Sequence, residues 1–170
     1  FTNLSVLENL MMVPGNQSGE KLMNALLKPS VVAKEESQIK DKAMEVVDFL
    51  NHGHLKNELA GNLSGGQKKL LELGRTMMVD AKLVLLDEVG AGVNRTLLKD
   101  LGTAIEKLNK EKGYTFCMIE HDMDFIGRLC DPVIVMAEGS VLFEGSVENA
   151  KKDDKVIESY LGKGSKLKDN

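Results

Sequence analysis

The sequence predicts an α/β protein in which a helical region precedes a core built on a parallel β-sheet. In the first third of the chain, apolar residues recur at helical spacing and form no convincing strand. From Leu83 onward, short unbroken apolar runs alternate with helical segments, as strands and helices do in a parallel sheet covered on both faces. Ligands of such sheets bind beyond the carboxyl ends of the strands, so the polar residues there are candidates for function.

Composition places the chain among ordinary globular proteins. Its 170 residues are 42% hydrophobic and 28% charged, which is enough for one domain with a sizeable core. A net charge of −4 gives no support for a nucleic-acid partner, which usually requires a basic surface. Cys117 and Cys130 lie in or beside apolar runs and are interpreted as free thiols of a cytosolic protein. No apolar run approaches the roughly 18 residues that a membrane-spanning helix needs.

The helical region is expected to contain three helices. The first starts at a capping box, Ser5 to Glu8, in which a hydroxyl and a carboxylate satisfy the first amides of the helix. His52 and His54 follow the third helix in what we expect to be a solvated loop rather than a zinc site, because no cysteine lies nearby. The expected helices cover residues 5–13, 18–28 and 31–50.

The stretch Ser64-Gly65-Gly66-Gln67 opens the next helix, and its residue types suit an anion. Ser64 is the predicted N-cap, since its hydroxyl can accept a hydrogen bond from an amide of the first turn. Gly65 and Gly66 carry no side chains where a ligand oxygen would approach the backbone, and helix N-termini bind anions. The alternative is an ordinary capped helix after a glycine turn, and local chemistry alone does not decide between the two.

Strands and helices alternate through the rest of the chain. A turn at Glu138-Gly139 separates the last two expected strands, and the segment from Lys163 is expected to be a frayed tail. The expected strands cover residues 83–86, 115–119, 133–136 and 141–143, and the expected helices cover 64–78, 95–112, 122–129 and 156–161.

Two acids and a histidine follow the first two expected strands. Asp87 and Glu88 are costly to bury without a cation or hydrogen-bond donors. They suit a site in which Asp87 orients the shell of Mg²⁺ and Glu88 polarises an attacking water, although acids are also common where strands simply reach solvent. His121 could reach a γ-phosphate or hold the same water, although a lone histidine is more often structural.

Taken in order, these motifs resemble those of the ATP-binding subunits of ABC transporters. The stretch Leu63 to Gln67 matches the signature motif of that family letter for letter, and Leu83 to Glu88 matches its Walker B strand with the catalytic glutamate. The loop from Gly90 to Asn94 falls on the D-loop, and His121 falls on the switch histidine. The resemblance runs from Phe1 to about Gly162.

The resemblance implies the ABC helical subdomain over residues 1–75, with the signature motif, and a partial P-loop NTPase core over residues 76–170. It also implies ATP and Mg²⁺ as cofactors. Glu88 and His121 would be catalytic, and Asp87 would hold Mg²⁺ through water. The implied nucleotide contacts are Ser64, Gly65, Gly66, Gln67 and Asn94, with the Ser64 loop meeting the γ-phosphate of an ATP that a second subunit holds.

A narrower resemblance points to the ATPase subunits of branched-chain amino acid importers, with urea importers as the close competitor. It rests on Leu4 to Leu10, Ala91 to Asn94, Ile119 to Met123 and Val156 to Gly162. The implied partners are a second ATPase subunit, identical or different, and transmembrane permease subunits, with the protein peripheral to the cytoplasmic face of the plasma membrane. The alternative is a soluble ABC protein that acts through protein or nucleic-acid contacts instead of transport.

The chain departs from the family pattern in several places. Val89 stands where the family usually has proline, and Asn94 stands where the D-loop commonly has aspartate. No Gly-x-x-x-x-Gly-Lys-Ser/Thr motif is present, and the glutamine loop expected just before Phe1 is missing. We therefore expect the carboxyl-terminal two-thirds of a subunit, inactive alone, whose incomplete core self-associates or repacks to cover open sheet edges and apolar faces.

Overall fold

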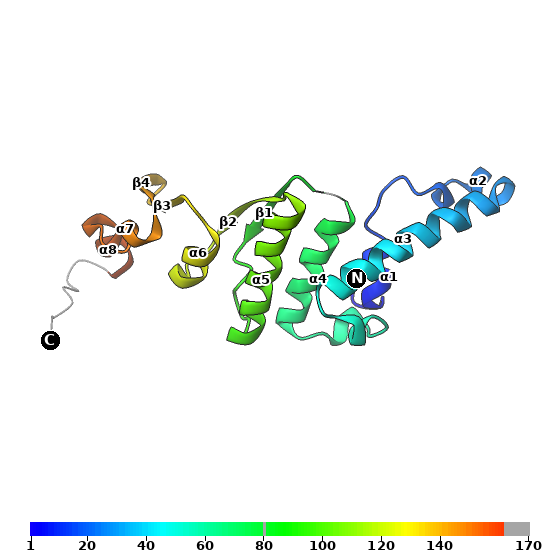
Figure 1. Ribbon diagram of the computed structural model, residues 1–170, viewed down its shortest axis with the longest axis horizontal. Coiled ribbons are helices and arrows are strands. Elements are labelled where there is room, and N and C mark those ends of the chain that lie inside the picture. Colours follow the sequence, from blue (N-terminus) through cyan, green and yellow to red (C-terminus); the bar gives the residue numbers. More distant parts are fainter. Residues whose placement is uncertain (80, 162–170) are drawn as a thin grey trace. The chain divides into compact units, whose positions relative to one another are not determined.

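Figure 1 shows the computed structural model, which describes residues 1–79 and 81–161. By packing, the chain divides into two compact units, Phe1–Cys117 and Met118–Asn170. The boundary predicted near residue 75, between the helical subdomain and the ATPase core, divides the chain by function and not by packing. It stays a prediction. The predicted tail from Lys163 lies outside the described residues. Within the described ranges, no helix combines the length and the apolar character needed to cross a bilayer.

The helical region of the first unit forms much as the sequence predicts. The capping box is present, because the Ser5 hydroxyl accepts a bond from the Glu8 N–H and the Glu8 carboxylate accepts one from the Ser5 N–H. The helix expected over 18–28 instead begins as a separate 3₁₀ turn. The helices are α1 (Val6–Met11), α2 (Leu22–Leu27), α3 (Pro29–Phe49) and α4 (Gly65–Met78), with 3₁₀ turns at Ser18–Glu20, Gly53–Leu55 and Ala60–Asn62.

The core of the first unit lies where α4 packs against α1, α3 and α5 (Arg95–Lys112). Leu10, Val47 and Leu108 are completely buried there. Gly74 allows the close approach of α4 to α3, because a Cβ at this position would lie 2.8 Å from Cδ1 of Leu50. Tight packing of this kind fixes the direction in which the start of α4 points.

His52 corrects one expectation, because it is buried rather than solvated, while His54 is exposed. Its Nδ1 lies 2.8 Å from the carbonyl oxygen of Leu50, and its Nε2 has no hydrogen-bond partner among the described residues. Burial lowers the pKa of His52, because the charged ring would lose its hydration. The neutral ring therefore belongs to the packing that closes the end of α3.

Strands β1 (Leu83–Asp87) and β2 (Thr115–Ile119) form a two-stranded parallel sheet, with α5 as the crossover between them. This confirms the predicted parallel arrangement for the two strands that precede the candidate acids and histidine. The expected covering of both faces is wrong for both strands. In β1, Val84 is buried whereas Leu83 and Leu85 are exposed. In β2, Thr115, Cys117 and Ile119 are exposed, so one face of each strand is open. Self-association through the open face stays a prediction.

The second unit is built on an antiparallel hairpin, β3 (Val133–Ala137) and β4 (Ser140–Gly145). Glu138 and Gly139 both have positive φ, at 49° and 76°, which is the backbone of the tight turns that suit hairpins. The hairpin packs with α7 (Val147–Ala150) and α8 (Asp154–Leu161), and side chains of α6 (Met123–Leu129) pack against the same core. The buried residues of this core are Val133, Val135, Val147, Ala150 and Val156.

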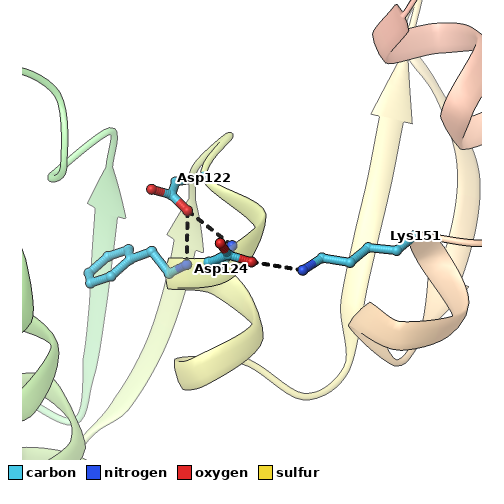
Figure 2. A network of polar contacts seen from close by, with 4 residues as sticks. Asp122, Asp124 and Lys151 are labelled. Atoms are coloured by element: carbon cyan, nitrogen blue, oxygen red, sulfur yellow. Dashed lines mark hydrogen bonds and ion pairs between the residues drawn. The ribbon is translucent and has the colours of Figure 1, made fainter. Parts of the chain in front are cut away.

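Figure 2 shows the polar contacts at the start of α6 in the second unit. The Asp122 carboxylate caps α6 by accepting hydrogen bonds at 3.0 Å from the N–H groups of Asp124 and Phe125. Lys151, just after α7, pairs with the Asp124 carboxylate at 2.8 Å. The pair is open to solvent and contributes little, so the cap and the apolar core hold the unit together.

Candidate functional site

Ser64 is the N-cap of α4, as the sequence predicts, and Gln67 completes a capping box with it. The Ser64 hydroxyl accepts a bond from the Gln67 N–H at 3.4 Å, and the Gln67 side-chain oxygen accepts one from the Ser64 N–H at 2.9 Å. Neither of these bonds involves the backbone N–H of Gly65 or Gly66. Within the described residues, those two amides make no hydrogen bond. The helix therefore begins with two unpaired donors at the positive end of its dipole.

The two glycines of this motif have different surroundings. Gly65 is exposed, and a Cβ there would meet only the carbonyl oxygen of Gly92, at 3.9 Å. Gly66 is buried, and a Cβ there would lie 2.5 Å from Cδ1 of Leu97 and 3.1 Å from Cγ1 of Val93. The sequence predicts that both glycines clear space for a ligand. Gly66 also has a packing role that the sequence did not reveal, because Leu97 is distant along the chain.

The loop from Gly90 to Asn94 lies beside the start of α4, because Gly66 packs against the residues at and after its end. Asn94 is the N-cap of α5, and its side-chain oxygen accepts a bond from the Leu97 N–H at 3.0 Å. A ligand contact from Asn94 would therefore use its amide nitrogen. The structure thus brings together the predicted nucleotide-contacting residues Ser64 to Gln67 and Asn94.

Asp87 and Glu88 are both exposed at the carboxyl end of β1, where the sequence predicts them. Glu88 has a φ of 45°, in the left-handed region that a non-glycine residue adopts at a cost of about 1 kcal/mol or more. Its carbonyl accepts a bond from the Ala91 N–H at 3.1 Å, which starts the turn into the loop. Such backbone strain is common at functional sites, where it fixes the direction of a side chain.

His121 follows β2 and is exposed. It belongs to the second unit, whereas Glu88 belongs to the first, so their meeting at one water stays a prediction. The neighbouring Asp122 serves as the cap of α6, which fixes the start of the helix that follows His121.

The predicted roles of the two acids differ: Asp87 would hold Mg²⁺ through water, and Glu88 would polarise a water. The described residues contain no group of three or more His, Cys, Asp or Glu side chains that could hold a metal ion by themselves. Mg²⁺ is usually bound by one or two carboxylates together with waters and phosphate oxygens, and does not need a complete protein cage. The role of Asp87 toward Mg²⁺ therefore stays a prediction.

The comparison with protein families identifies the class of protein. Residues 1–91, more than half of the chain, match the family described as ABC transporter. The chain belongs to this family, and its predicted membership is confirmed. Solved ATP-binding cassettes share its α/β architecture, which confirms the predicted fold class. ABC proteins of this kind bind nucleotide, generally with Mg²⁺.

Individual relatives narrow the comparison. The chain is 42% identical over 159 residues to a probable branched-chain amino acid transport ATP-binding protein, LivG, of Archaeoglobus fulgidus, a match that covers 94% of the chain and 60% of that protein. It is 39% identical over 163 residues to the probable LivG protein of Methanocaldococcus jannaschii, a match that covers 94% of the chain and 62% of that protein. The ADP conformation of a solved ABC transporter ATP-binding cassette matches with a TM-score of 0.74 and 36% identity, covering 95% of this chain and 64% of that one. The chain thus spans somewhat less than two thirds of the length of these relatives.

Proposed function

We propose that this chain is part of the ATP-hydrolysing subunit of an ABC importer, and that the importer carries branched-chain amino acids. The observation that carries the proposal is the open start of α4, where the amides of Gly65 and Gly66 are unpaired at a helix N-terminus. The substrate class is supported by the names of the LivG relatives, which match nearly the whole chain.

In the proposed subunit, the start of α4 binds the γ-phosphate of an ATP that a second ATPase subunit holds. Gly65 and Gly66 donate their amides, and Ser64 and Gln67 keep those amides in place through the capping box. Asn94 contacts the same nucleotide from the adjacent loop with its amide nitrogen. The resulting site is half of a nucleotide site, and the second subunit supplies the other half.

The residues that follow β1 and β2 supply the chemistry in this proposal. Glu88 polarises the attacking water, and His121 holds the γ-phosphate or the same water. Asp87 would hold Mg²⁺ through water, and the ion would neutralise phosphate charge when bound. Phosphoryl transfer needs mainly positioning and charge compensation. These three side chains would serve the ATP on the P-loop of their own subunit, while the amides of α4 meet the ATP of the second subunit.

ATP-binding subunits of transporters generally pair with one another and with permease subunits. We propose the same partners here, with the second ATPase subunit identical or different and the permease subunits spanning the membrane. The subunit would be peripheral to the membrane, at its cytoplasmic face. Nucleic acid is not among the proposed partners, since the net charge is −4.

The central test is Glu88→Gln in the full-length subunit. This change keeps the size of the side chain and removes the charge that polarises water, so hydrolysis should be abolished while ATP remains bound. The matched control is Glu111→Gln, which removes the same charge from an exposed position on α5 and should leave hydrolysis unchanged. Phosphate release and binding of radiolabelled ATP measure the two properties. Undiminished hydrolysis by the Glu88 variant would refute the assignment.

The 170-residue chain by itself should bind ATP only weakly, because it contains no Walker A sequence to hold the phosphates. Titration calorimetry with ATP and Mg²⁺ tests this, and micromolar binding would contradict it. Uptake of leucine against uptake of urea by the assembled transporter separates the two importer classes. Failure to co-purify with membrane subunits would favour the soluble, non-transport alternative instead.

A further inference from the structure

Helix α2 presents its apolar side chains to solvent, contrary to the usual behaviour of a surface helix. Leu22, Met23, Leu26 and Leu27 make up four of its six residues, and each is between 65% and 74% exposed. Helix α1 has the same length but buries Val6 and Leu10 in the core. Spacings of one and four residues place the α2 side chains along one face, and Val31 in the first turn of α3 is 51% exposed as well.

Lysines border this face. Residues 21–34 contain Lys21, Lys28 and Lys34 and no acid, whereas Glu20 precedes this segment and Glu35 and Glu36 follow it. All three lysines are exposed. Lys21 and Lys28 flank α2 at its two ends, so the apolar face lies between two positive charges. Apolar side chains bordered by lysines are typical of helices that lie in a membrane interface, where the ammonium groups reach the lipid headgroups.

The segment that carries α2 is fastened to the rest of the unit. The Glu35 carboxylate on α3 accepts a bond from the Ser18 N–H at 2.8 Å, and Gly19 lies so close to α3 that a Cβ would be 3.1 Å from Cγ1 of Val32. Figure 1 shows α2 at the outer end of α3, away from α4 and α5. The face is therefore held in place on the outside of the unit, apart from the candidate nucleotide site.

We propose that α2 and the start of α3 form a contact surface for an anionic lipid bilayer. The surface consists of Leu22, Met23, Leu26, Leu27 and Val31, bordered by Lys21, Lys28 and Lys34. Its apolar side chains enter the interface, and the lysines pair with negatively charged headgroups. A second copy of the chain fits less well, because two such surfaces meeting would oppose lysines with lysines. The proposal does not depend on nucleotide and goes beyond the proposed transport role.

The test uses the whole chain with vesicles of phosphatidylglycerol and phosphatidylethanolamine, without ATP or other subunits. Flotation should show binding to these vesicles and at least about tenfold weaker binding to phosphatidylcholine vesicles, with a loss of binding at high salt. Leu22→Ser with Leu26→Ser should abolish binding, and Lys21→Gln with Lys28→Gln should weaken it about tenfold or more. Because the altered side chains are exposed, the variants should stay folded, which circular dichroism would check.

Matched controls separate this surface from other exposed apolar residues. Leu85→Ser changes a side chain on β1 that is 73% exposed, and Lys107→Gln with Lys110→Gln removes two exposed charges from α5. Both controls should bind anionic vesicles as the unaltered chain does. The chain has no tryptophan, so Leu26→Trp gives a single reporter whose emission should shift to the blue with anionic vesicles, whereas Leu85→Trp should not respond.

Several results would overturn the proposal. Absence of vesicle binding by the unaltered chain would do so, as would equal binding by the α2 variants and their controls. Sedimentation velocity tests the alternative that a second copy of the chain covers this surface. If the Leu22 and Leu26 changes dissolve an oligomer while no vesicle binding occurs, a second copy covers the surface. If the surface binds a purified permease subunit in detergent but no lipid, its partner is a protein. Because these experiments contain no nucleotide, their outcome does not bear on the proposed ATP hydrolysis, and the two proposals can fail separately.

Discussion

Helices α1 and α4 begin with the same capping box and differ in what lies inside it. In both, a serine hydroxyl caps the third residue of the helix and the side chain of that residue returns to the serine N–H. In α1 the two residues between are Val6 and Leu7, and their amides bond to the carbonyls of Glu58 and Lys56 at 3.0 Å. In α4 they are Gly65 and Gly66, whose amides make no bond within the described residues.

The two capping boxes also differ in charge, and this difference again makes the α4 start the more open to an anion. In α1 the returning side chain is the carboxylate of Glu8, which already complements the positive end of the helix dipole. In α4 it is the neutral amide of Gln67, which leaves that end without a negative charge. The comparison shows what separates the proposed anion site at α4 from the α1 start: α4 has no side chains at its first two positions, no internal acceptors for their amides and no acid of its own in the box.

The largest expected effect concerns the packing that holds the α4 start beside its neighbouring loop. Gly66→Val should destabilise the chain by about 3 kcal/mol, because its first atom would overlap Leu97 and Val93. Gly65→Val, at an exposed position, should cost less than about 1 kcal/mol. Urea unfolding followed by circular dichroism measures both. Adding Leu97→Ala to the Gly66 variant should recover part of the loss, and equal costs at the two glycines would contradict the structure.

The next largest effect is expected on ATP hydrolysis when the charges of the two capping boxes are exchanged. Gln67→Glu would give α4 the acid of α1, so in the full-length subunit it should slow ATP hydrolysis by about tenfold or more through repulsion of the phosphate. The converse change, Glu8→Gln, should leave hydrolysis unaltered because α1 has no proposed ligand. Steady-state phosphate release measures both. Normal hydrolysis by the Gln67 variant would show that the α4 start does not meet an anion.

A smaller effect tests whether the caps themselves are equivalent. Ser5→Ala and Ser64→Ala should each lower the free energy of unfolding by about 1 kcal/mol, the usual value for a lost N-cap. Urea unfolding of the chain measures both variants. Only Ser64→Ala should also impair hydrolysis in the full-length subunit. A large difference in stability between the two would mean that the capping boxes are not alike.

The sequence predicts these caps because they are local. A serine and an acid or amide three residues apart can satisfy each other with no help from the rest of the chain, so Ser5 and Ser64 are recognisable without a structure. The same holds for the acids after β1, which follow directly from the apolar run before them. The order of the motifs then identifies the family, since each motif alone has an ordinary structural explanation.

What the sequence did not predict depends on contacts between distant residues. The carbonyl groups that bond the amides of Val6 and Leu7 belong to residues about fifty positions later, and no local sequence pattern predicts them. The burial of His52 depends on how the end of α3 packs, and a histidine-rich turn usually suggests solvent. The exposure of Leu85 runs against its apolar surroundings, because periodicity shows which residues could be covered but not whether a covering element is present.

The smallest expected effect is a difference in pH dependence between the two boxes. The pKa of Glu8 is lowered from its ordinary 4.5, because the hydroxyl and the N–H of Ser5 donate to its carboxylate. As the pH falls below about 4.5, the unfolded chain therefore takes up a proton before the folded one does. The stability that Glu8 provides is present above that pH and is lost progressively below it. Gln67 does not titrate, so the α4 box should contribute no such slope.

Comparing the chain with its Glu8→Gln variant isolates this slope. The lowered pKa of His52 also makes stability fall, starting below the ordinary value of 6.5, but His52 is present in both proteins and its effect cancels in the difference. Urea unfolding between pH 7 and pH 3 should show the two stabilities converging as the pH falls. Parallel curves would mean that the carboxylate of Glu8 does not stabilise the α1 start. The electrostatic contrast between the two helix starts would then lose its basis, and only the difference in amide pairing would remain.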